Sequence, residues 1–291
     1  MADRAEGGRT IAQALSAARR RLREAGAPTP DLDARLLAQD AFGLDAASLI
    51  LRGDHMPEPG NSEAFAAMLE RRLAGEPVHR ILGRRAFYDH VFELSPATLE
   101  PRPDTEILVD LAAKALRTRG AGEPVFADLG TGTGAIAVSL LAMFTGARCL
   151  AVDISVEALA TARRNAGAAG VAGRFLPVAG DYLAAVGGPL DMVVSNPPYI
   201  TTVDVARLSR DVREHDPRLA LDGGADGLDA YRRIADDLLR QSAPPADLLF
   251  EIGQGQLQDV CEIMQRARYT LREPSPDLSG TVRALWFVGD R

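Results

Sequence analysis

The fold is decided by a stretch that reads VFADLGTGTG, from Val125 to Gly134. Its first half is an apolar run with the length of a buried strand. Its second half is a glycine-rich loop, whose backbone can adopt positive φ angles and approach a ligand closely. The apolar segment Ala135–Met143 follows at once and is typical of a helix. We therefore expect a strand, a ligand-binding turn and a helix in direct succession.

Strand-like and helix-like segments alternate from this stretch to the C-terminus. Strands are expected at Val125–Leu129, Cys149–Asp153, Phe175–Ala179, Asp191–Ser195, Leu248–Glu251, Tyr269–Glu273 and Val282–Val288. Helices are expected at Ala135–Met143, Val156–Ala166, Leu228–Gln241 and Gln256–Arg266. Regular alternation predicts an α/β fold with a parallel sheet. The closely spaced final pair indicates an antiparallel last strand, so we expect a Rossmann-like, mostly parallel sheet of seven strands.

The chain before this alternation has a helical part and an extended part. Helical periodicity runs from about Thr10 to Gly75, with Thr10 and Ser62 as expected caps of the first and fourth helices. Residues 78–104 suggest a β-hairpin followed by a proline-rich linker. We expect an N-terminal helical domain at residues 1–77, the hairpin and linker at 78–104, and the large domain at 105–291. Arginine runs in the helical domain fit either a solvated face or a docking surface for a partner.

The composition argues against several classes of protein. With 33 Lys and Arg against 40 Asp and Glu, the net charge of −7 disfavours broad capture of duplex nucleic acid. Cys149 and Cys261 lie in apolar runs and the four histidines are scattered, so neither a disulfide framework nor a metal site is expected. The charged N-terminus has no apolar signal core, and no apolar stretch is long enough to span a bilayer. We expect a cytoplasmic protein without a membrane partner.

Polar residues at three strand ends indicate the ligand of the glycine loop. Asp128 precedes Gly130-Thr131-Gly132-Thr133-Gly134, where it would repel a pyrophosphate but suit a cationic amino acid group. Asp153 ends the second strand and can accept hydrogen bonds from ribose hydroxyls. After the third strand, Asp181 can accept from an adenine amino group and Tyr182 can pack on the ring. NAD enzymes use similar loops, so the loop alone does not exclude a dinucleotide. Together these elements fit S-adenosylmethionine better.

A second motif, Asn196-Pro197-Pro198-Tyr199, follows the fourth expected strand. Two consecutive prolines lack the N–H groups that a sheet needs, so the strand must end at Asn196 and continue as a stiff loop. The loop presents the carbonyls of Asn196 and Pro197, the side-chain carbonyl of Asn196 and the ring of Tyr199. Such acceptors beside a ring are suited to hold an NH2 group conjugated to a π system. A plain Pro-Pro turn is the alternative.

Two further segments are expected near the cleft. Arg102 lies between Pro101 and Pro103, so its side chain is held stiffly and can face the substrate, although an inert linker fits too. Residues 201–227 form a long segment of mixed charge, with glycines at 223, 224 and 227. This segment fits a lid over the site or a plain surface loop.

With these motifs placed, the chain resembles the class I S-adenosylmethionine-dependent methyltransferases, and among them the release factor glutamine methyltransferase family. The resemblance covers nearly the whole chain. Its motifs are Gly75-Glu76-Pro77 with Ile81-Leu82-Gly83 and Phe87, Pro101–Glu106, Asp128–Gly134, Asn196–Tyr199, Asp222–Leu228, and Glu251-Ile252-Gly253 followed by Gln256. The proline-rich linker and the Asp-Gly-Gly segment are much more specific than the glycine loop. An Asn-Pro-Pro-Tyr tetrapeptide alone is shared with methyltransferases that act on the amino group of DNA adenine.

The resemblance implies a helical N-terminal domain that docks the substrate and is joined to the catalytic domain by a hairpin. It implies methyl transfer from S-adenosylmethionine, leaving S-adenosylhomocysteine, to the glutamine side-chain amide in the Gly-Gly-Gln motif of peptide chain release factors. Cofactor contacts would come from Gly130–Gly134, Asp153, Tyr182 and Asn196. Asn196–Tyr199 would hold the glutamine: the Asn196 side-chain oxygen and the Pro197 carbonyl would each accept one amide hydrogen, and Tyr199 would stack on the amide.

Two positions depart from the family's pattern. The family often has a tryptophan near the position of Tyr182, and it often has Glu-Pro where this chain reads Asp216-Pro217. Two other functions also fit. A DNA or RNA amino-group methyltransferase would use the same tetrapeptide, but it would need a basic face and a flipped base. A non-catalytic S-adenosylmethionine-binding partner of the translation apparatus is the second, and the intact tetrapeptide argues against it.

Overall fold

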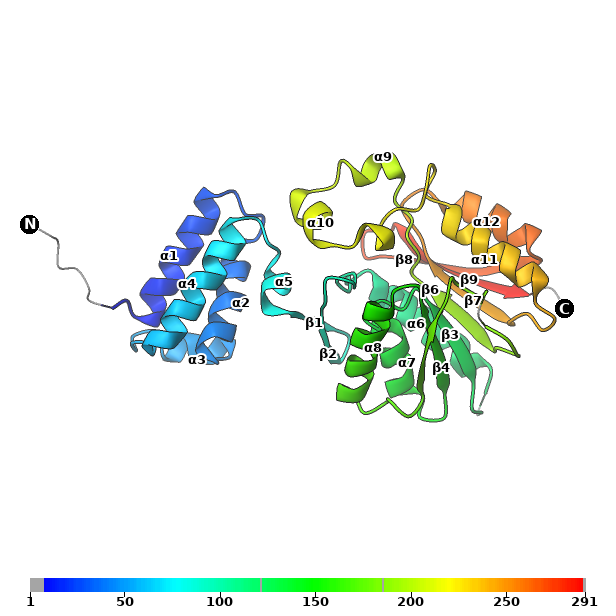
Figure 1. Ribbon diagram of the computed structural model, residues 1–291, viewed down its shortest axis with the longest axis horizontal. Helices are drawn as coiled ribbons and strands as arrows, with labels where there is room; N and C mark the ends of the chain where they lie inside the picture. Colours follow the sequence, from blue (N-terminus) through cyan, green and yellow to red (C-terminus); the bar gives the residue numbers. More distant parts are fainter. Residues whose placement is uncertain (1–7, 121, 185, 290–291) are drawn as a thin grey trace, which may run out of the picture. The chain divides into compact units, whose positions relative to one another are not determined.

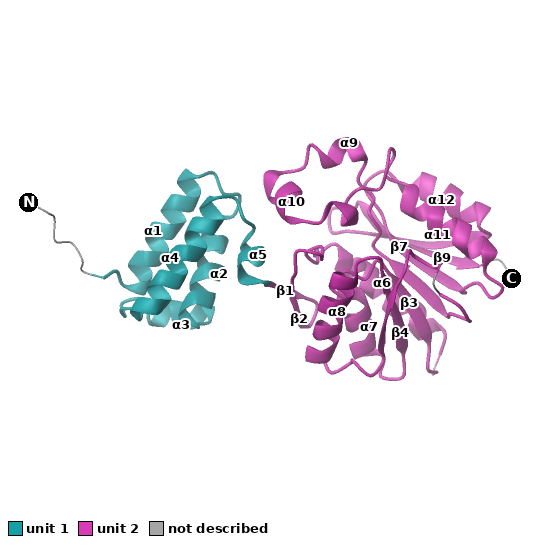
Figure 2. Cartoon of the chain, in the orientation of Figure 1, with its two compact units in different colours: residues 1–83 teal, residues 84–291 magenta. Residues whose placement is uncertain are grey.

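The computed structural model describes residues 8–120, 122–184 and 186–289, and the chain forms two compact units, residues 1–83 and 84–291 (Figure 2). The boundary expected after residue 77 is therefore too early. Helix α5, Val78–Leu82, belongs to the first unit because its Val78 and Ile81 side chains are buried in that unit's core. The glycine that ends this helix, Gly83, has a φ of 68° and turns the chain out of the unit.

The first unit is a bundle of short helices. They are α1 (Ile11–Glu24), α2 (Pro30–Phe42), α3 (Ala46–Leu51), α4 (Pro59–Leu73) and α5. Thr10 caps α1 as expected, in a reciprocal capping box with Gln13. The cap expected at Ser62 is wrong, because Pro59 occupies the first turn and α4 begins there. Apolar side chains from all five helices form one core.

The second unit begins with the expected β-hairpin. Strands β1 (Arg84–Phe87) and β2 (His90–Glu93) pair antiparallel, and Tyr88 turns the chain between them with a φ of 52°. Phe87 and Phe92 point into the same core as the helices of this unit. The hairpin is therefore part of the large unit rather than a free linker.

The centre of the second unit is a sheet of seven strands in the order β5-β4-β3-β6-β7-β9-β8 (Figure 1). The strands are β3 (Val125–Leu129), β4 (Arg148–Asp153), β5 (Phe175–Ala179), β6 (Met192–Ser195), β7 (Asp247–Glu251), β8 (Tyr269–Pro276) and β9 (Val282–Gly289). All pairs are parallel except those of β9, which runs antiparallel to both β7 and β8. The expected mostly parallel sheet with an antiparallel last strand is confirmed.

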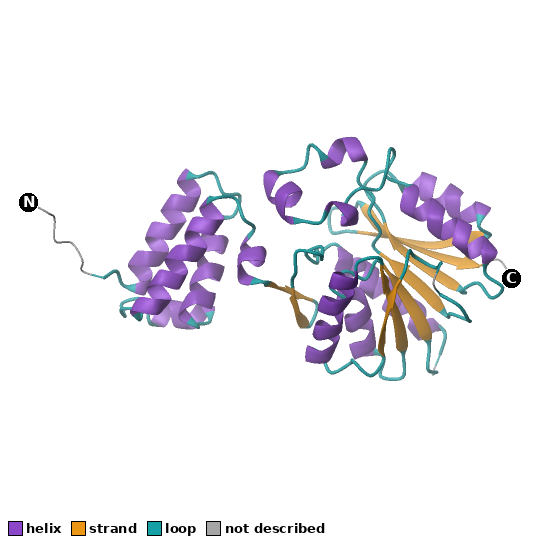
Figure 3. Ribbon diagram, viewed as in Figure 1, coloured by secondary structure: helices purple, strands orange, loops and turns teal. Residues whose placement is uncertain are grey.

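Helices cover both faces of this sheet (Figure 3). Helices α6 (Thr105–Thr118), α7 (Ala135–Met143) and α8 (Val156–Ala168) pack on one face, and α11 (Asp229–Arg240) and α12 (Leu257–Arg266) on the other. The strands alternate accordingly: Phe126 lies in the first core and its neighbour Ala127 in the second. None of the helices that the structure describes has the length and apolar character needed to cross a membrane.

The strand order places several loops at one edge of the sheet. Strand β3 lies between β4 and β6. Strands β4 and β5 extend the sheet on one side of β3, and β6 and β7 extend it on the other side, so the strand order reverses at β3. Leu129 pairs with both Val152 and Ser195, and Asp153 pairs with Ala179. The carboxyl ends of four strands are therefore level, at the type of switch point where α/β proteins bind ligands.

Candidate active site

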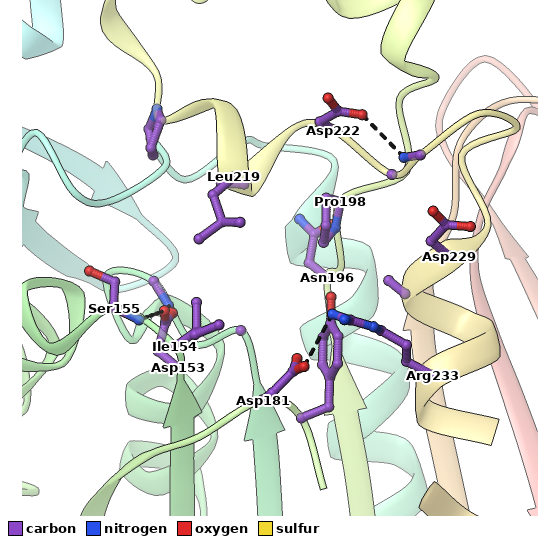
Figure 4. Close-up of a pocket in the computed structure, with 18 of the residues that line it drawn as sticks. Asp153, Ile154, Ser155, Asp181, Asn196, Pro198, Leu219, Asp222, Asp229 and Arg233 are labelled. Carbon is purple, nitrogen blue, oxygen red and sulfur yellow. Dashed lines mark hydrogen bonds and ion pairs between the residues drawn. The ribbon is translucent and has the colours of Figure 1, made fainter. Parts of the chain in front are cut away.

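A cavity of about 820 Å³ opens at this edge of the sheet (Figure 4). Most of its walls come from the loops that follow β3, β4, β5 and β6, and from residues 202–236. Of the residues expected from the sequence, those that line it are Gly130, Gly132, Asp153, Asp181, Tyr182, Asn196 and Pro198. Asp128, Thr131, Thr133, Gly134, Pro197, Tyr199 and Arg102 are not among the lining residues.

The glycine loop forms the floor of the cavity after β3. Gly130 and Gly132 have φ angles of 71° and 56°, and residues that carry a side chain rarely adopt such angles. A Cβ atom at Gly130 would meet nothing within 4 Å, so the cavity occupies the space where its side chain would be. Gly134 is the N-cap of helix α7 and serves packing instead, since a Cβ atom there would lie 3.2 Å from Ala162. The loop thus offers a bare backbone cradle.

Asp153 stands beside this cradle at the end of β4. Its Oδ2 accepts a hydrogen bond from the Gly132 amide and its Oδ1 one from the Ser155 amide, both at 2.9 Å (Figure 4). Burial raises the pKa of this carboxyl despite those two amides. Each oxygen keeps a lone pair for a hydroxyl donor. The Gly132 amide that a pyrophosphate would need is already occupied by a carboxylate, so the loop does not suit a dinucleotide.

Asp128 supports the loop from behind. Its Oδ2 accepts from the Thr131 hydroxyl at 2.7 Å and from the Ala137 amide at 3.3 Å, and the residue is 1% exposed. Burial raises the pKa of this carboxyl to about 7. The expected contact with a cationic ligand group is therefore corrected: Asp128 holds the turn together. Thr133 likewise faces inward, and its carbonyl accepts from Asn165.

Asp181 and Tyr182 form the wall after β5. Tyr182 has a φ of 49°, a left-handed conformation that costs free energy outside glycine and is common at functional sites. Burial raises the pKa of its hydroxyl to about 12. Asp181 forms an ion pair of 3.1 Å with Arg233 of α11 (Figure 4). This pair uses only Oδ2 of the carboxylate, so the expected acceptance from an adenine amino group stays a prediction.

Asn196 lies directly after β6, with its side chain held at one end. Its Nδ2 donates to the Thr105 hydroxyl at 3.1 Å. Within the part of the chain that the structure describes, no hydrogen bond is made to its Oδ1. The neighbouring Ser195 hydroxyl donates to the Leu129 carbonyl at 2.6 Å, which ties the ends of β6 and β3 together. The cavity wall therefore includes a carboxamide whose nitrogen is held by Thr105 and whose oxygen accepts no hydrogen bond from the described residues.

Tyr199 is fixed by Glu251, the last residue of β7, and by Gln256 in the loop after it. Its hydroxyl donates to Glu251 Oε1 at 3.4 Å, and its carbonyl accepts from Gln256 Nε2 at 3.0 Å. Glu251 is 2% exposed, and burial raises the pKa of its carboxyl to about 7. The sequence placed Glu251 and Gln256 in one motif, but it did not reveal their contacts with Tyr199.

Three glycines enclose the backbone of the Asn-Pro-Pro-Tyr loop. A Cβ atom at Gly223 would lie 2.6 Å from the Pro198 carbonyl oxygen. One at Gly227 would overlap the carbonyl of Tyr199, and one at Gly253 would lie 3.1 Å from the Tyr199 ring. The Asp-Gly-Gly and Glu-Ile-Gly motifs therefore form a close-fitting socket for this loop.

Arg102 does not line the cavity. It forms an ion pair of 2.7 Å with Asp216, whose side chain is 4% exposed. Asp216 belongs to residues 201–227, which contain α9 (Thr202–Val205), α10 (Arg210–His215) and the 3-10 turn η1 (Arg218–Ala220). Because Thr202, Leu219 and Asp222 line the cavity, this segment forms one of its walls rather than a detached surface loop.

The sequence matches two family models. Residues 13–83 match the PrmC N-terminal domain, and residues 105–216 match the methyltransferase small domain. The chain is 45% identical to a release factor glutamine methyltransferase of Bradyrhizobium diazoefficiens, over 94% of each chain. It is 44% identical to one of Agrobacterium fabrum, over 97% of this chain and 98% of the relative. The chain belongs to the release factor glutamine methyltransferase family.

A more distant relative supports the fold alone. A methyltransferase from Pyrococcus furiosus superposes with a TM-score of 0.51 at 17% identity, over 77% of this chain and 100% of that one. The class I methyltransferase fold is thus common to this family member and to a protein of very different sequence.

The cavity fits the cofactor of such a methyltransferase. A bare backbone cradle, a carboxylate with free lone pairs and the half-buried ring of Tyr182 suit the amino acid, ribose and adenine parts of S-adenosylmethionine. Among residues 8–120, 122–184 and 186–289, no cluster of histidine, cysteine or acidic side chains is arranged to hold a metal ion.

Proposed function

We propose that this protein transfers a methyl group from S-adenosylmethionine to the side-chain amide nitrogen of the glutamine in the Gly-Gly-Gln motif of peptide chain release factors. The family membership supports the reaction and the substrate. The observation that carries the proposal is the state of Asn196: its amide nitrogen is held by Thr105, while its oxygen is free in the wall of the cavity that the glycine loop also lines.

The cofactor would be held by the residues that follow β3, β4 and β5. When bound, S-adenosylmethionine supplies an electrophilic methyl group on a sulfonium. Gly130 and Gly132 let the backbone approach its amino acid part, Asp153 accepts from the ribose hydroxyls, and Tyr182 packs on the adenine. Asp128, buried behind the loop, would keep the turn in the shape that binds the cofactor.

The substrate carboxamide would be held by the Asn-Pro-Pro-Tyr loop. Asn196 Oδ1 and the Pro197 carbonyl each accept one amide hydrogen, which aims the nitrogen lone pair at the methyl group. Positioning of this kind is worth roughly 7–11 kcal/mol in favourable cases. The two acceptors also stabilise the positive charge that develops on the nitrogen. No separate base is needed, because the methylated amide loses its proton readily.

Tyr199 and the first unit would contribute indirectly. Tyr199 is anchored through Glu251 and Gln256, so its ring can present a fixed face to the substrate amide. The helical unit of residues 1–83 would dock the release factor, and the arginine-rich faces of α1 and α4 are the candidate surface. The cytoplasmic location expected from the sequence remains a prediction.

Two parallel incubations test the proposal against the nucleic-acid alternative. The protein is mixed with radiolabelled S-adenosylmethionine and either a release factor or a mixture of DNA and RNA. Label in the release factor alone supports the proposal. Label in nucleic acid would overturn it. Calorimetric binding of the cofactor with no label in either tube would favour the non-catalytic alternative.

A further inference from the structure

The contact between Asn196 and Thr105 joins two motifs that are 91 residues apart. Thr105 is the first residue of α6 and is 5% exposed. It belongs to the proline-rich motif Pro101–Glu106. The helix cap is Asp104, and no side chain completes a capping hydrogen bond there. The Thr105 hydroxyl accepts from Asn196 Nδ2 at 3.1 Å.

The orientation of a carboxamide matters for this reaction. If the Asn196 side chain were turned by half a rotation, its NH2 group would face the NH2 group of the substrate, and two donors would oppose each other. A hydroxyl can either donate or accept a hydrogen bond, so Thr105 alone does not select one orientation. A further group must fix the direction of the hydroxyl hydrogen.

The candidate for this group is Glu251. It is 2% exposed and accepts from the Tyr199 hydroxyl through Oε1. Its Oε2 is also buried, and among the described residues no hydrogen bond of good geometry reaches it. The Thr105 hydroxyl is close enough to lower the pKa of this carboxyl. When that hydroxyl turns its hydrogen to Glu251, its lone pairs face the Asn196 amide nitrogen.

We propose that Thr105 is a positioning residue which, backed by Glu251, holds the Asn196 carboxamide with its oxygen toward the substrate. The inference rests on the proposed function for its catalytic consequence, but the orientation itself can be measured without turnover. With Glu251 ionised, the three residues Glu251, Thr105 and Asn196 set the direction of the hydrogen bonds: the carboxylate accepts, the hydroxyl donates and accepts, and the amide donates. Asn196 Oδ1 is then the acceptor that is left for the substrate amide.

Three variants of the full chain test this inference. Thr105→Val keeps the shape but removes the hydroxyl, and Thr105→Ser keeps the hydroxyl. Thr161→Val is the matched control, because Thr161 is another buried helical threonine, 1% exposed, whose hydroxyl donates to the Glu157 carbonyl. Thermal unfolding of each variant checks that the fold is retained.

The first readout is the split between kcat and KM with a release factor as substrate. We expect Thr105→Val to lower kcat roughly 10- to 100-fold, because a misplaced group near the reacting atoms costs up to this much. Cofactor affinity and the KM for the release factor should stay close to those of the wild type. Thr105→Ser should recover most of kcat, and Thr161→Val should not change it. Wild-type kcat in Thr105→Val, or no recovery in Thr105→Ser, overturns the inference.

The second readout is the exchange of the Asn196 side-chain amide protons by nuclear magnetic resonance, with the signals assigned from their absence in Asn196→Ala. Slow exchange in the wild type and fast exchange in Thr105→Val support the inference. Equal exchange in the two proteins overturns it, whatever the activity. A wild-type protein that protects this amide but does not methylate release factors would refute the proposed function alone.

Discussion

The carboxamide of Asn196 has its nitrogen bonded to Thr105 and its oxygen free at the cavity. Replacement by alanine removes the acceptor and leaves the glycine loop intact. We expect Asn196→Ala to lower kcat roughly 100- to 1,000-fold, the loss typical of one stabilising polar group in an active site. Cofactor binding, followed by calorimetry, should remain detectable. Near-normal turnover in this variant would remove Asn196 from the mechanism.

Glu251 gives the protein a pH-dependent stability. Burial raises the pKa of its carboxyl to about 7, while the hydroxyls of Thr105 and Tyr199 and the charge of Arg283 lower it and that of Asp104 raises it. The folded state therefore keeps a proton that the unfolded chain releases above its ordinary pKa of 4.5. This contribution to stability is complete below that pKa and is lost as the pH rises to about 7.

We expect Glu251→Gln to flatten this pH dependence. Between pH 5 and 7 the free energy of unfolding should fall less steeply than in the wild type, by up to about 1.4 kcal/mol per pH unit. Denaturant titrations at several pH values can follow Trp286, which is buried in the same unit and is the single tryptophan of the chain. The exposed Glu262→Gln serves as a control. Equal slopes for Glu251→Gln and the wild type would show that the buried carboxyl does not titrate in this range.

At the scale of elements, local patterns predicted most boundaries. Helix Ala135–Met143 and strand Phe175–Ala179 have the bounds expected from the sequence, because glycine loops and apolar runs delimit them locally. The start of α4 was missed, since Ser62 and Pro59 are both acceptable N-terminal residues and only the packing of the bundle selects between them. The end of the first unit was missed for a similar reason: α5 is too short to show a helical period.

The socket around the Asn-Pro-Pro-Tyr loop permits a test with two glycines. Gly227 and Gly280 have φ angles of 79° and 85°, so alanine should be strained by about 1–2 kcal/mol at either position. Only at Gly227 would the new Cβ atom overlap a neighbour, the Tyr199 carbonyl, whereas at Gly280 nothing lies within 4 Å. We expect Gly227→Ala to lose most methyl transfer and Gly280→Ala to retain it, as measured by turnover at saturating cofactor. Full activity in Gly227→Ala would contradict the role of the socket.

At the scale of the whole molecule, the contacts that the sequence did not reveal are those between distant segments. Arg102 is 114 residues from Asp216, and Asn196 is 91 residues from Thr105. A single sequence shows that these residues belong to motifs, but it does not show which motif meets which. The set of strand-end loops at the site was predictable from the order of elements. The ion pairs that Arg102 and Asp181 form were not.

The first unit contains a buried ion pair of its own. Arg72 of α4 and Asp33 of α2 lie 2.7 Å apart, with side chains 7% and 6% exposed. Removing one member of a buried pair costs about 3–5 kcal/mol, because the other charge stays buried. We expect Asp33→Ala to increase hydrogen exchange throughout α2 and α4, with β3 to β7 unaffected. Glu70→Ala, which breaks an exposed pair with Arg21, should have little effect. Unchanged protection in Asp33→Ala would refute this role of the pair.

The central claim is that a proline-stiffened loop holds a glutamine carboxamide for methylation. Tandem mass spectrometry of the Gly-Gly-Gln peptide, taken from a release factor after incubation with the protein and S-adenosylmethionine, tests it most directly. The account predicts one added methyl group on the glutamine side-chain nitrogen, present with the wild type and absent with Asn196→Ala. An unmodified glutamine after incubation with the wild type, or a methyl group on any other residue, would contradict it.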